Sequence, residues 1–156
     1  MIKWKQSIFA SLLHLKNCFI MTAEEILQRH KLKNTGCRKF ILTELLRSDS
    51  ALSEEEIKKS FPELFDRVTF YRTLKTLEEQ HVIHRIVLHD NSVKYALNGH
   101  HSDQNPVHAH FHCGKCDEVL CLEGKSQVDT ELPTDFVTHE VFVVVEGLCA
   151  DCNHLS

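Results

Sequence analysis

Two C-x-x-C pairs constrain this chain more than any other feature of its 156 residues: Cys113 with Cys116, and Cys149 with Cys152. Each pair presents two thiolates from one tight turn, and two pairs supply the four tetrahedral ligands of a structural zinc ion. Because 32 residues separate the pairs, intervening strands must bring them together. The sequence therefore predicts a closed zinc site of four thiolates, with no coordination position left for a substrate.

The remaining cysteines argue against a disulfide framework. Cys18, Cys37 and Cys121 make seven in total, so complete pairing within one chain is impossible, and a reducing, cytoplasmic location is the simpler expectation. The alternative to zinc is a set of reducible thiols without metal. A thioredoxin-like redox site would instead need one C-x-x-C beside a βαβ unit.

Charge divides the chain near residue 98. Residues 1–98 carry 16 Lys and Arg against 12 Asp and Glu, whereas residues 99–156 carry 2 against 10, and the net charge is −4. A basic first half and an acidic second half are expected when only one domain meets an anionic partner.

The first half predicts a winged helix-turn-helix domain over residues 21–97, after an N-terminal extension of residues 1–20 that is too short to span a bilayer. Helix starts are indicated by Thr22 with Glu25, by Asn34 or Thr35, by Ser53 with Glu56, and by Asp66. The fourth helix is expected to bury a stripe of Val68, Tyr71, Leu74 and Leu77. Strands at 82–88 and 92–97, turning at residues 89–91, would form the wing.

The second half predicts a small α/β domain, which makes the fold class α+β. Residues 98–107 have a linker composition, and residues 108–156 are expected to form the zinc-binding dimerisation domain. Its predicted strands are 108–112, 119–122 and 136–146, with a helical or irregular stretch around 125–131.

Histidines are concentrated between residues 81 and 112, where eight of the twelve lie. His108 and His110 point to the same side of a strand, as two ligands of one metal must, and His112 shares that side. Cys121 on the next strand can add a thiolate, or can be a small buried hydrophobic residue.

Three segments taken together resemble the ferric uptake regulator (Fur) family from Ala23 onward: Arg-Val-Thr-Phe-Tyr-Arg-Thr-Leu at 67–74, His-x-His-Phe-x-Cys-x-x-Cys at 108–116, and Cys-x-x-Cys at 149–152. The resemblance implies a homodimeric repressor whose helix 67–80 enters the major groove of a palindromic DNA operator. It also implies a regulatory metal near the hinge between the domains.

The resemblance places Tyr71 and Arg72 at the DNA surface and matches Arg38 to an arginine that opens the second helix. The other interpretation of Tyr71 is a core aromatic residue, whereas Arg72 favours a phosphate or base contact. The candidate DNA-binding residues are Arg38, Arg67, Thr69, Tyr71, Arg72 and Lys75.

The candidate regulatory site departs from that of iron and peroxide sensors. An acidic ligand is replaced by Cys121, and Ala51 and Ala96 stand at two further ligand positions; Ala109 and Val128 stand at positions of the family's further C-terminal site. A thiolate in place of a carboxylate shifts preference from iron towards zinc. The expected ligands of this regulatory Zn²⁺ are His84, His108, His110 and Cys121, with His89, Asp90, His100 and His101 as substitutes for His84.

The sequence thus predicts a metal-responsive repressor of metal-homeostasis genes that senses zinc, with no membrane and no small-molecule substrate. One alternative is an iron- or peroxide-responsive member of the same family. The other alternative is a protein-interaction module that is stabilised by zinc and does not bind DNA. The basic first half of the chain argues against this alternative. A zinc deaminase would need H-x-E with P-C-x-x-C, and neither motif is present.

Overall fold

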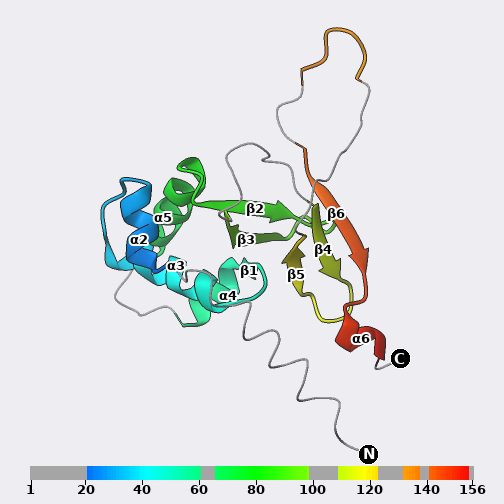
Figure 1. Ribbon diagram of the computed structural model, residues 1–156, viewed down its shortest axis with the longest axis horizontal. Helices are drawn as coiled ribbons and strands as arrows, with labels where there is room; N and C mark the ends of the chain where they lie inside the picture. Colours follow the sequence, from blue (N-terminus) through cyan, green and yellow to red (C-terminus); the bar gives the residue numbers. More distant parts are fainter. Residues whose placement is uncertain (1–20, 61–65, 99–108, 123–131, 138–140, 155–156) are drawn as a thin grey trace, which may run out of the picture.

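The computed structural model describes residues 21–60, 66–98, 109–122, 132–137 and 141–154. Four helices and two three-stranded sheets account for most of them, and a fifth, short helix follows the last strand (Figure 1). The elements in chain order are α2 (Ala23–Arg29), α3 (Gly36–Arg47), β1 (Leu52–Ser53), α4 (Glu54–Lys59), α5 (Arg67–Glu79), β2 (Ile83–Val87), β3 (Val93–Leu97), β4 (Ala109–Cys113), β5 (Val119–Cys121), β6 (Val143–Gly147) and α6 (Ala150–His154).

Side-chain caps fix where α2, α4 and α5 begin, as the sequence predicts. Thr22 and Ser53 form capping boxes with the glutamates three residues later. Asp66 accepts from the backbone N–H of Thr69 at 2.9 Å and so begins α5. Each cap satisfies backbone donors that the first turn of a helix leaves without partners.

The buried stripe of α5 differs from the prediction. Val68 is 56 % exposed and Tyr71 is 36 % exposed, whereas Phe70, Leu74 and Leu77 are fully buried. The predicted helix is therefore confirmed. Its predicted buried stripe is right for Leu74 and Leu77 and wrong for Val68 and Tyr71, which face solvent. Phe70 points into a core made by α2, α3, α4, α5 and the start of β2.

The predicted wing is confirmed as the antiparallel hairpin of β2 and β3, with His84 opposite Ala96. Asn91 takes a positive φ of 64° in the connecting turn, a conformation that Asn tolerates better than most residues. The two-residue strand β1 adds to β3 through Leu52 and Tyr95 and was not predicted.

The second sheet has the order β5-β4-β6, in which β4 pairs antiparallel with β5 and parallel with β6. The predicted strand at 136–146 was too long, because β6 begins at Val143 and residues 141–142 are not in a strand. The stretch at 125–131 lies outside the described residues. Helix α6 was not predicted.

The wing hairpin extends from the helices towards the second sheet (Figure 1). An apolar cluster joins the two sheets there; it consists of Ala51, Ile86, Leu88, Ala96 and Val119, with Val144 packed against it. The backbone N–H of Ala51 also donates to the carbonyl of Val119 at 2.8 Å. Among the described residues, no helix is both long and apolar enough to cross a membrane.

Candidate metal centres and nucleic-acid interface

Each C-x-x-C turn forms a cysteine knuckle, the first with Cys113 and Cys116 and the second with Cys149 and Cys152. The four knuckle cysteines converge where β4 ends and α6 begins, with their sulfur atoms within 4.8 Å of one another. Cys113 is completely buried and Cys152 is 7 % exposed. The Sγ atoms of Cys116 and Cys149 lie 3.7 Å apart, close to the separation of about 3.8 Å that zinc–sulfur bonds of about 2.3 Å impose on two corners of a tetrahedron. The donors present therefore fit a zinc ion.

Backbone donors make one of these thiols acidic. The N–H of Cys149 donates to Cys113 Sγ at 3.3 Å, and this bond, with those from the N–H groups of Cys116 and Lys115, lowers the pKa of Cys113 to about 6. Burial, reinforced by the neighbouring thiols, raises the pKa of Cys152 to about 12. A bound cation would remove this conflict, because it stabilises all four thiolates.

A second cluster brings together His84 of β2, His110 of β4 and Cys121 of β5, with ligand atoms within 4.8 Å of one another. His84 Nε2 lies 3.0 Å from His110 Nε2 and 3.8 Å from Cys121 Sγ. On the other side of the ring, His84 Nδ1–H donates to Asn98 Oδ1 at 2.6 Å. That bond leaves the lone pair of Nε2 facing the cluster, as a metal-binding imidazole requires.

Three of the four predicted regulatory ligands are therefore brought together, and the fourth, His108, lies outside the described residues. His100 and His101 lie outside them as well. Neither His89 nor Asp90 joins this cluster: His89 stands beside His112, and the Asp90 carboxylate accepts from the backbone N–H of Ser92 in the turn of the wing. Desolvation raises the pKa of the Cys121 thiol, although the residue as a whole is exposed.

Exposed cations lie along α5. Arg67, Arg72 and Lys75 are exposed, and the guanidinium of Arg67 lies 5.6 Å from the centre of the Tyr71 ring. Lys58 of α4, which sequence reasoning missed, donates to the Tyr71 hydroxyl at 3.0 Å and stands 4.3 Å from the ring centre. Tyr71 is thus held at the surface between two cations, not in the core.

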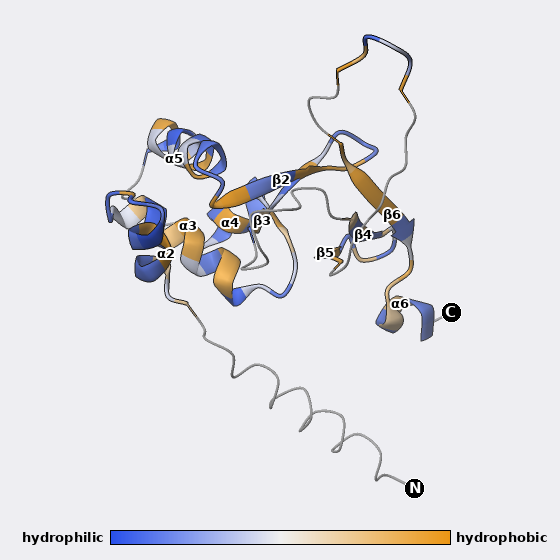
Figure 2. Ribbon diagram, turned by 45° about the horizontal axis from the view of Figure 1, so that its top comes forward, coloured by the Kyte–Doolittle hydropathy of each residue, from blue (hydrophilic) through white to orange (hydrophobic). Residues whose placement is uncertain are grey.

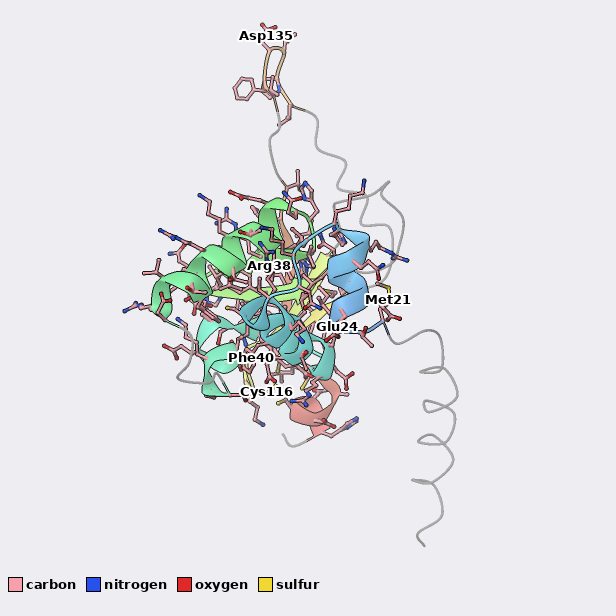
Figure 3. All side chains as sticks on the ribbon, turned by 90° about the vertical axis from the view of Figure 1, so that its left-hand side faces the viewer. Met21, Glu24, Arg38, Phe40, Cys116 and Asp135 are labelled. Atoms are coloured by element: carbon pink, nitrogen blue, oxygen red, sulfur yellow. The ribbon has the colours of Figure 1, made fainter. Side chains whose placement is uncertain are left out.

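Arg38 lies beside α5 (Figure 3) and lines a cleft of about 310 Å³ between the start of α3 and α5, to which α5 contributes Arg72. Its guanidinium donates to the carbonyl of Lys33 at 2.9 Å. The side chain of Thr35 forms no cap at this helix end, and the N-terminus of a helix favours an anion. Thr69 lines the same cleft, and its hydroxyl donates to the capping carboxylate of Asp66 at 2.6 Å.

A buried cation between the sheets was not predicted. Lys94 of β3 is 3 % exposed, and its Nζ contacts Asp117 Oδ2 at 2.7 Å, immediately after the first knuckle. Hydrogen bonding from Lys94 is the largest of the effects that hold the pKa of Asp117 below its usual value. Asp117 also accepts from His112 Nε2 at 2.9 Å.

A winged helix joined to a sheet that carries thiolate and imidazole clusters defines a metal-responsive, DNA-binding regulator of transcription. The model of the ferric uptake regulator family matches residues 29–141. A ferric uptake regulation protein of Campylobacter upsaliensis is 30 % identical over 142 residues, which is 84 % of this chain and 86 % of that protein. The chain belongs to the ferric uptake regulator family, so it is a transcription regulator and not an enzyme.

Solved structures share the fold. The ferric uptake regulator of Helicobacter pylori, described as having three functional metal-binding sites, superposes with a TM-score of 0.54 at 21 % identity, covering 86 % of this chain and 95 % of that one. A zinc uptake regulator in complex with zinc and DNA gives a TM-score of 0.58 at 24 % identity, covering 85 % and 91 %. Both structural similarities support the arrangement of a winged helix followed by a second sheet.

Proposed function

We propose that this protein is a homodimeric repressor of metal-homeostasis genes that senses zinc. The observation that carries the proposal is the convergence of His84, from the wing, with His110 and Cys121, from the second sheet. An ion held by these residues would join the DNA-binding half of the chain to the other half. Metal occupancy and DNA binding would then depend on the same contact.

The chemistry of the donors favours zinc over iron. Two imidazoles and a thiolate form a softer set than the carboxylate-rich sites that suit oxidisable iron. Cys121 is the residue that makes the difference, and His108 is the proposed fourth ligand. The Cys113, Cys116, Cys149 and Cys152 cluster would hold a separate zinc ion with a structural role, since four thiolates complete a tetrahedron.

The proposed DNA-binding surface is the exposed face of α5 with the start of α3. Arg67, Tyr71 and Arg72 would contact the major groove, and Arg38 would meet a backbone phosphate at the cleft beside α5. Lys75 is exposed but lies 3.8 Å from Glu79, so we expect its contribution to be smaller. Lys58, beside Tyr71, joins the set.

Dimerisation is proposed through the face of the second sheet turned away from the wing. Alternation along the strands places Phe111, Leu120, Val143 and Val145 on that face, and β6 is hydrophobic along most of its length (Figure 2). Val145 is 47 % exposed. A twofold dimer would present two α5 helices to the half-sites of a palindromic operator in the cytoplasm.

The regulatory step follows from this geometry. Holding His84 against His110 and Cys121 would fix the orientation of each wing and therefore the separation of the two α5 helices. Only one separation matches operator half-sites one turn of DNA apart. When the wing is not held, the protein must lose more conformational freedom on binding DNA, and its affinity falls.

Gel retardation of operator DNA with and without Zn²⁺ tests the proposal on wild type and Cys121→Ala. Wild type should bind more tightly with Zn²⁺ than with anaerobic Fe²⁺, and Cys121→Ala should bind equally weakly in both. Cys37→Ala is the matched control, because Cys37 lies in the core away from the clusters. A wild-type response from Cys121→Ala contradicts the assignment of this ligand, and retardation under no condition favours the interaction module.

A further inference from the structure

A third group of metal-binding side chains lies beside the proposed regulatory site and takes no part in it. His89 comes from the turn of the wing, His112 from β4 and Glu146 from β6, with ligand atoms within 4.8 Å of one another. His89 Nδ1 lies 2.5 Å from Glu146 Oε1, and His112 Nδ1 lies 3.5 Å from the same oxygen. The group therefore joins the wing to the second sheet at another point.

Strand register explains why these residues meet. His112 pairs with Glu146 across the parallel β4–β6 ladder, whereas His110 pairs with Cys121 across the antiparallel β4–β5 ladder. Because His110 and His112 are two residues apart, both point to the same face of β4. One histidine thus meets a thiol on one side, and the next meets a carboxylate on the other.

The wing supplies one imidazole to each of the two groups. The rings of His84 and His110 have centres 5.2 Å apart, and those of His89 and His112 have centres 6.2 Å apart. The apolar cluster that contains Val119 and Val144 also lies between the wing and this sheet.

A buried nitrogen points into the group. His112 is 6 % exposed, and its Nδ1 is, within the part of the chain that the structure describes, the one buried side-chain nitrogen or oxygen without a hydrogen-bond partner. The opposite nitrogen, Nε2, donates to Asp117, so Nδ1 carries the lone pair. A buried lone pair without a donor needs an explanation, and a cation supplies one.

Asp117 completes the arrangement that metal-binding histidines usually show. A carboxylate that accepts from the far nitrogen fixes the tautomer and makes the near nitrogen a better ligand. Asp117 is itself held by Lys94, which donates to its backbone carbonyl at 2.6 Å as well as to its carboxylate. The contacts from Lys94 to Asp117 to His112 therefore fix the imidazole with Nδ1 on the side of Glu146.

We infer that His89, His112 and Glu146 bind a second wing-bridging divalent transition-metal ion, separate from the one at Cys121. Two imidazoles and a carboxylate without a thiolate suit Zn²⁺, Fe²⁺ and Mn²⁺ alike, so this site is less selective than its neighbour. The side chains of His89 and Glu146 are 69 % and 48 % exposed, which allows the ion to exchange with solvent. Ala109, at a position of the family's further C-terminal site, lies on the opposite face of β4 from His112.

Equilibrium dialysis against Zn²⁺, followed by metal analysis, tests this inference on the full-length protein. His89→Gln and Glu146→Gln should each hold one equivalent of Zn²⁺ per chain fewer than wild type. Asp90→Asn is the matched control in the same turn, because asparagine can keep the bond from the backbone N–H of Ser92, and it should hold the wild-type amount. Equal zinc contents in wild type and Glu146→Gln would overturn the inference.

Cobalt substitution separates this site from the proposed regulatory site. In protein whose knuckle cluster keeps zinc, Co²⁺ bound at Cys121 gives a thiolate-to-metal charge-transfer band, which Cys121→Ala should abolish. Glu146→Gln should keep that band while losing one equivalent of Co²⁺. Loss of the band in Glu146→Gln would mean that the residues form one site, and the inference would fail. Failure of the proposed function appears differently, as unchanged metal response of DNA binding in Cys121→Ala.

Discussion

Lys94 and Asp117 connect the wing to the first cysteine knuckle: the buried ammonium contacts the Asp117 carboxylate at 2.7 Å and its backbone carbonyl at 2.6 Å. The nearest other carboxylate is that of Glu56 at 3.7 Å. The two halves of the chain are therefore joined by a buried cation as well as by apolar packing.

Removing the Asp117 charge should destabilise the protein. Asp117→Asn leaves Lys94 buried with weaker partners but keeps a residue that tolerates the positive φ of 62°. Because Asp117 is 64 % exposed, we expect a loss of about 1 kcal/mol of unfolding free energy and not the several expected for a fully buried pair. Urea denaturation of the zinc-loaded protein measures it, with Glu118→Gln as the control. An unchanged midpoint would show that the ion pair contributes nothing.

Loss of one knuckle thiolate should remove the structural zinc. Cys149→Ser removes a sulfur ligand that lies 3.7 Å from the sulfur of Cys116. Structural zinc contributes on the order of 10 kcal/mol to the free energy of folding. Metal analysis after extensive dialysis should find one tightly held zinc fewer, and circular dichroism should show a loss of β-sheet signal. Cys37→Ala should retain the zinc. A stable, fully folded Cys149→Ser protein without zinc contradicts the structural role.

Side chains on α5 should control DNA affinity without affecting the fold. Arg72→Ala and Tyr71→Ala remove groups at an exposed surface, so circular dichroism and dimerisation should stay as in wild type while operator binding is lost. A single lost phosphate contact lowers the salt dependence of log K by about one unit of slope. Arg47→Ala, at the opposite end of α3 from Arg38, should bind normally. Normal binding by Arg72→Ala would place the interface elsewhere.

A charge on the outer face of the second sheet should prevent dimerisation. Val145→Asp places a carboxylate on an apolar face where the side chain is now 47 % exposed, and burying an unpaired charge in an interface is costly. Analytical ultracentrifugation should find monomers that keep their zinc. Asn153→Asp adds the same charge on α6 and should leave the dimer intact. If both variants sediment alike, the dimer forms through another surface.

The start of α5 was predictable from sequence, but its buried face was not. Asp66 followed by Thr69 signals a helix start locally, and the structure confirms it. Val68, Tyr71 and Leu74 recur at intervals of three residues, and Phe70, Leu74 and Leu77 at intervals of four and three; both spacings are helical, so periodicity allows either stripe to face the core. Packing against α2, α3 and α4 decides which stripe is buried, and the sequence of α5 alone does not specify that packing.

The candidate metal clusters were predictable to the extent that their ligands are close in sequence or on adjacent strands. The two C-x-x-C pairs indicate a zinc site by their spacing alone, and Cys121 follows His110 on the next strand along the chain. Glu146 could not be found in the same way, because only the parallel pairing of β4 with β6 places it beside His112. A lone carboxylate in the valine-rich strand β6 was the one local signal.

The spacing of His110 and His112 on one short strand has a consequence for the response to metal. A twist or shift of β4 that moves one imidazole relative to the wing must also move the other. Ions at the two groups would therefore be thermodynamically linked, and each would change the affinity of the other by the same factor. The first ion would bear the entropic cost of ordering the wing, so the second would bind more tightly. Such linkage makes occupancy rise more steeply with metal concentration than it does at an isolated site.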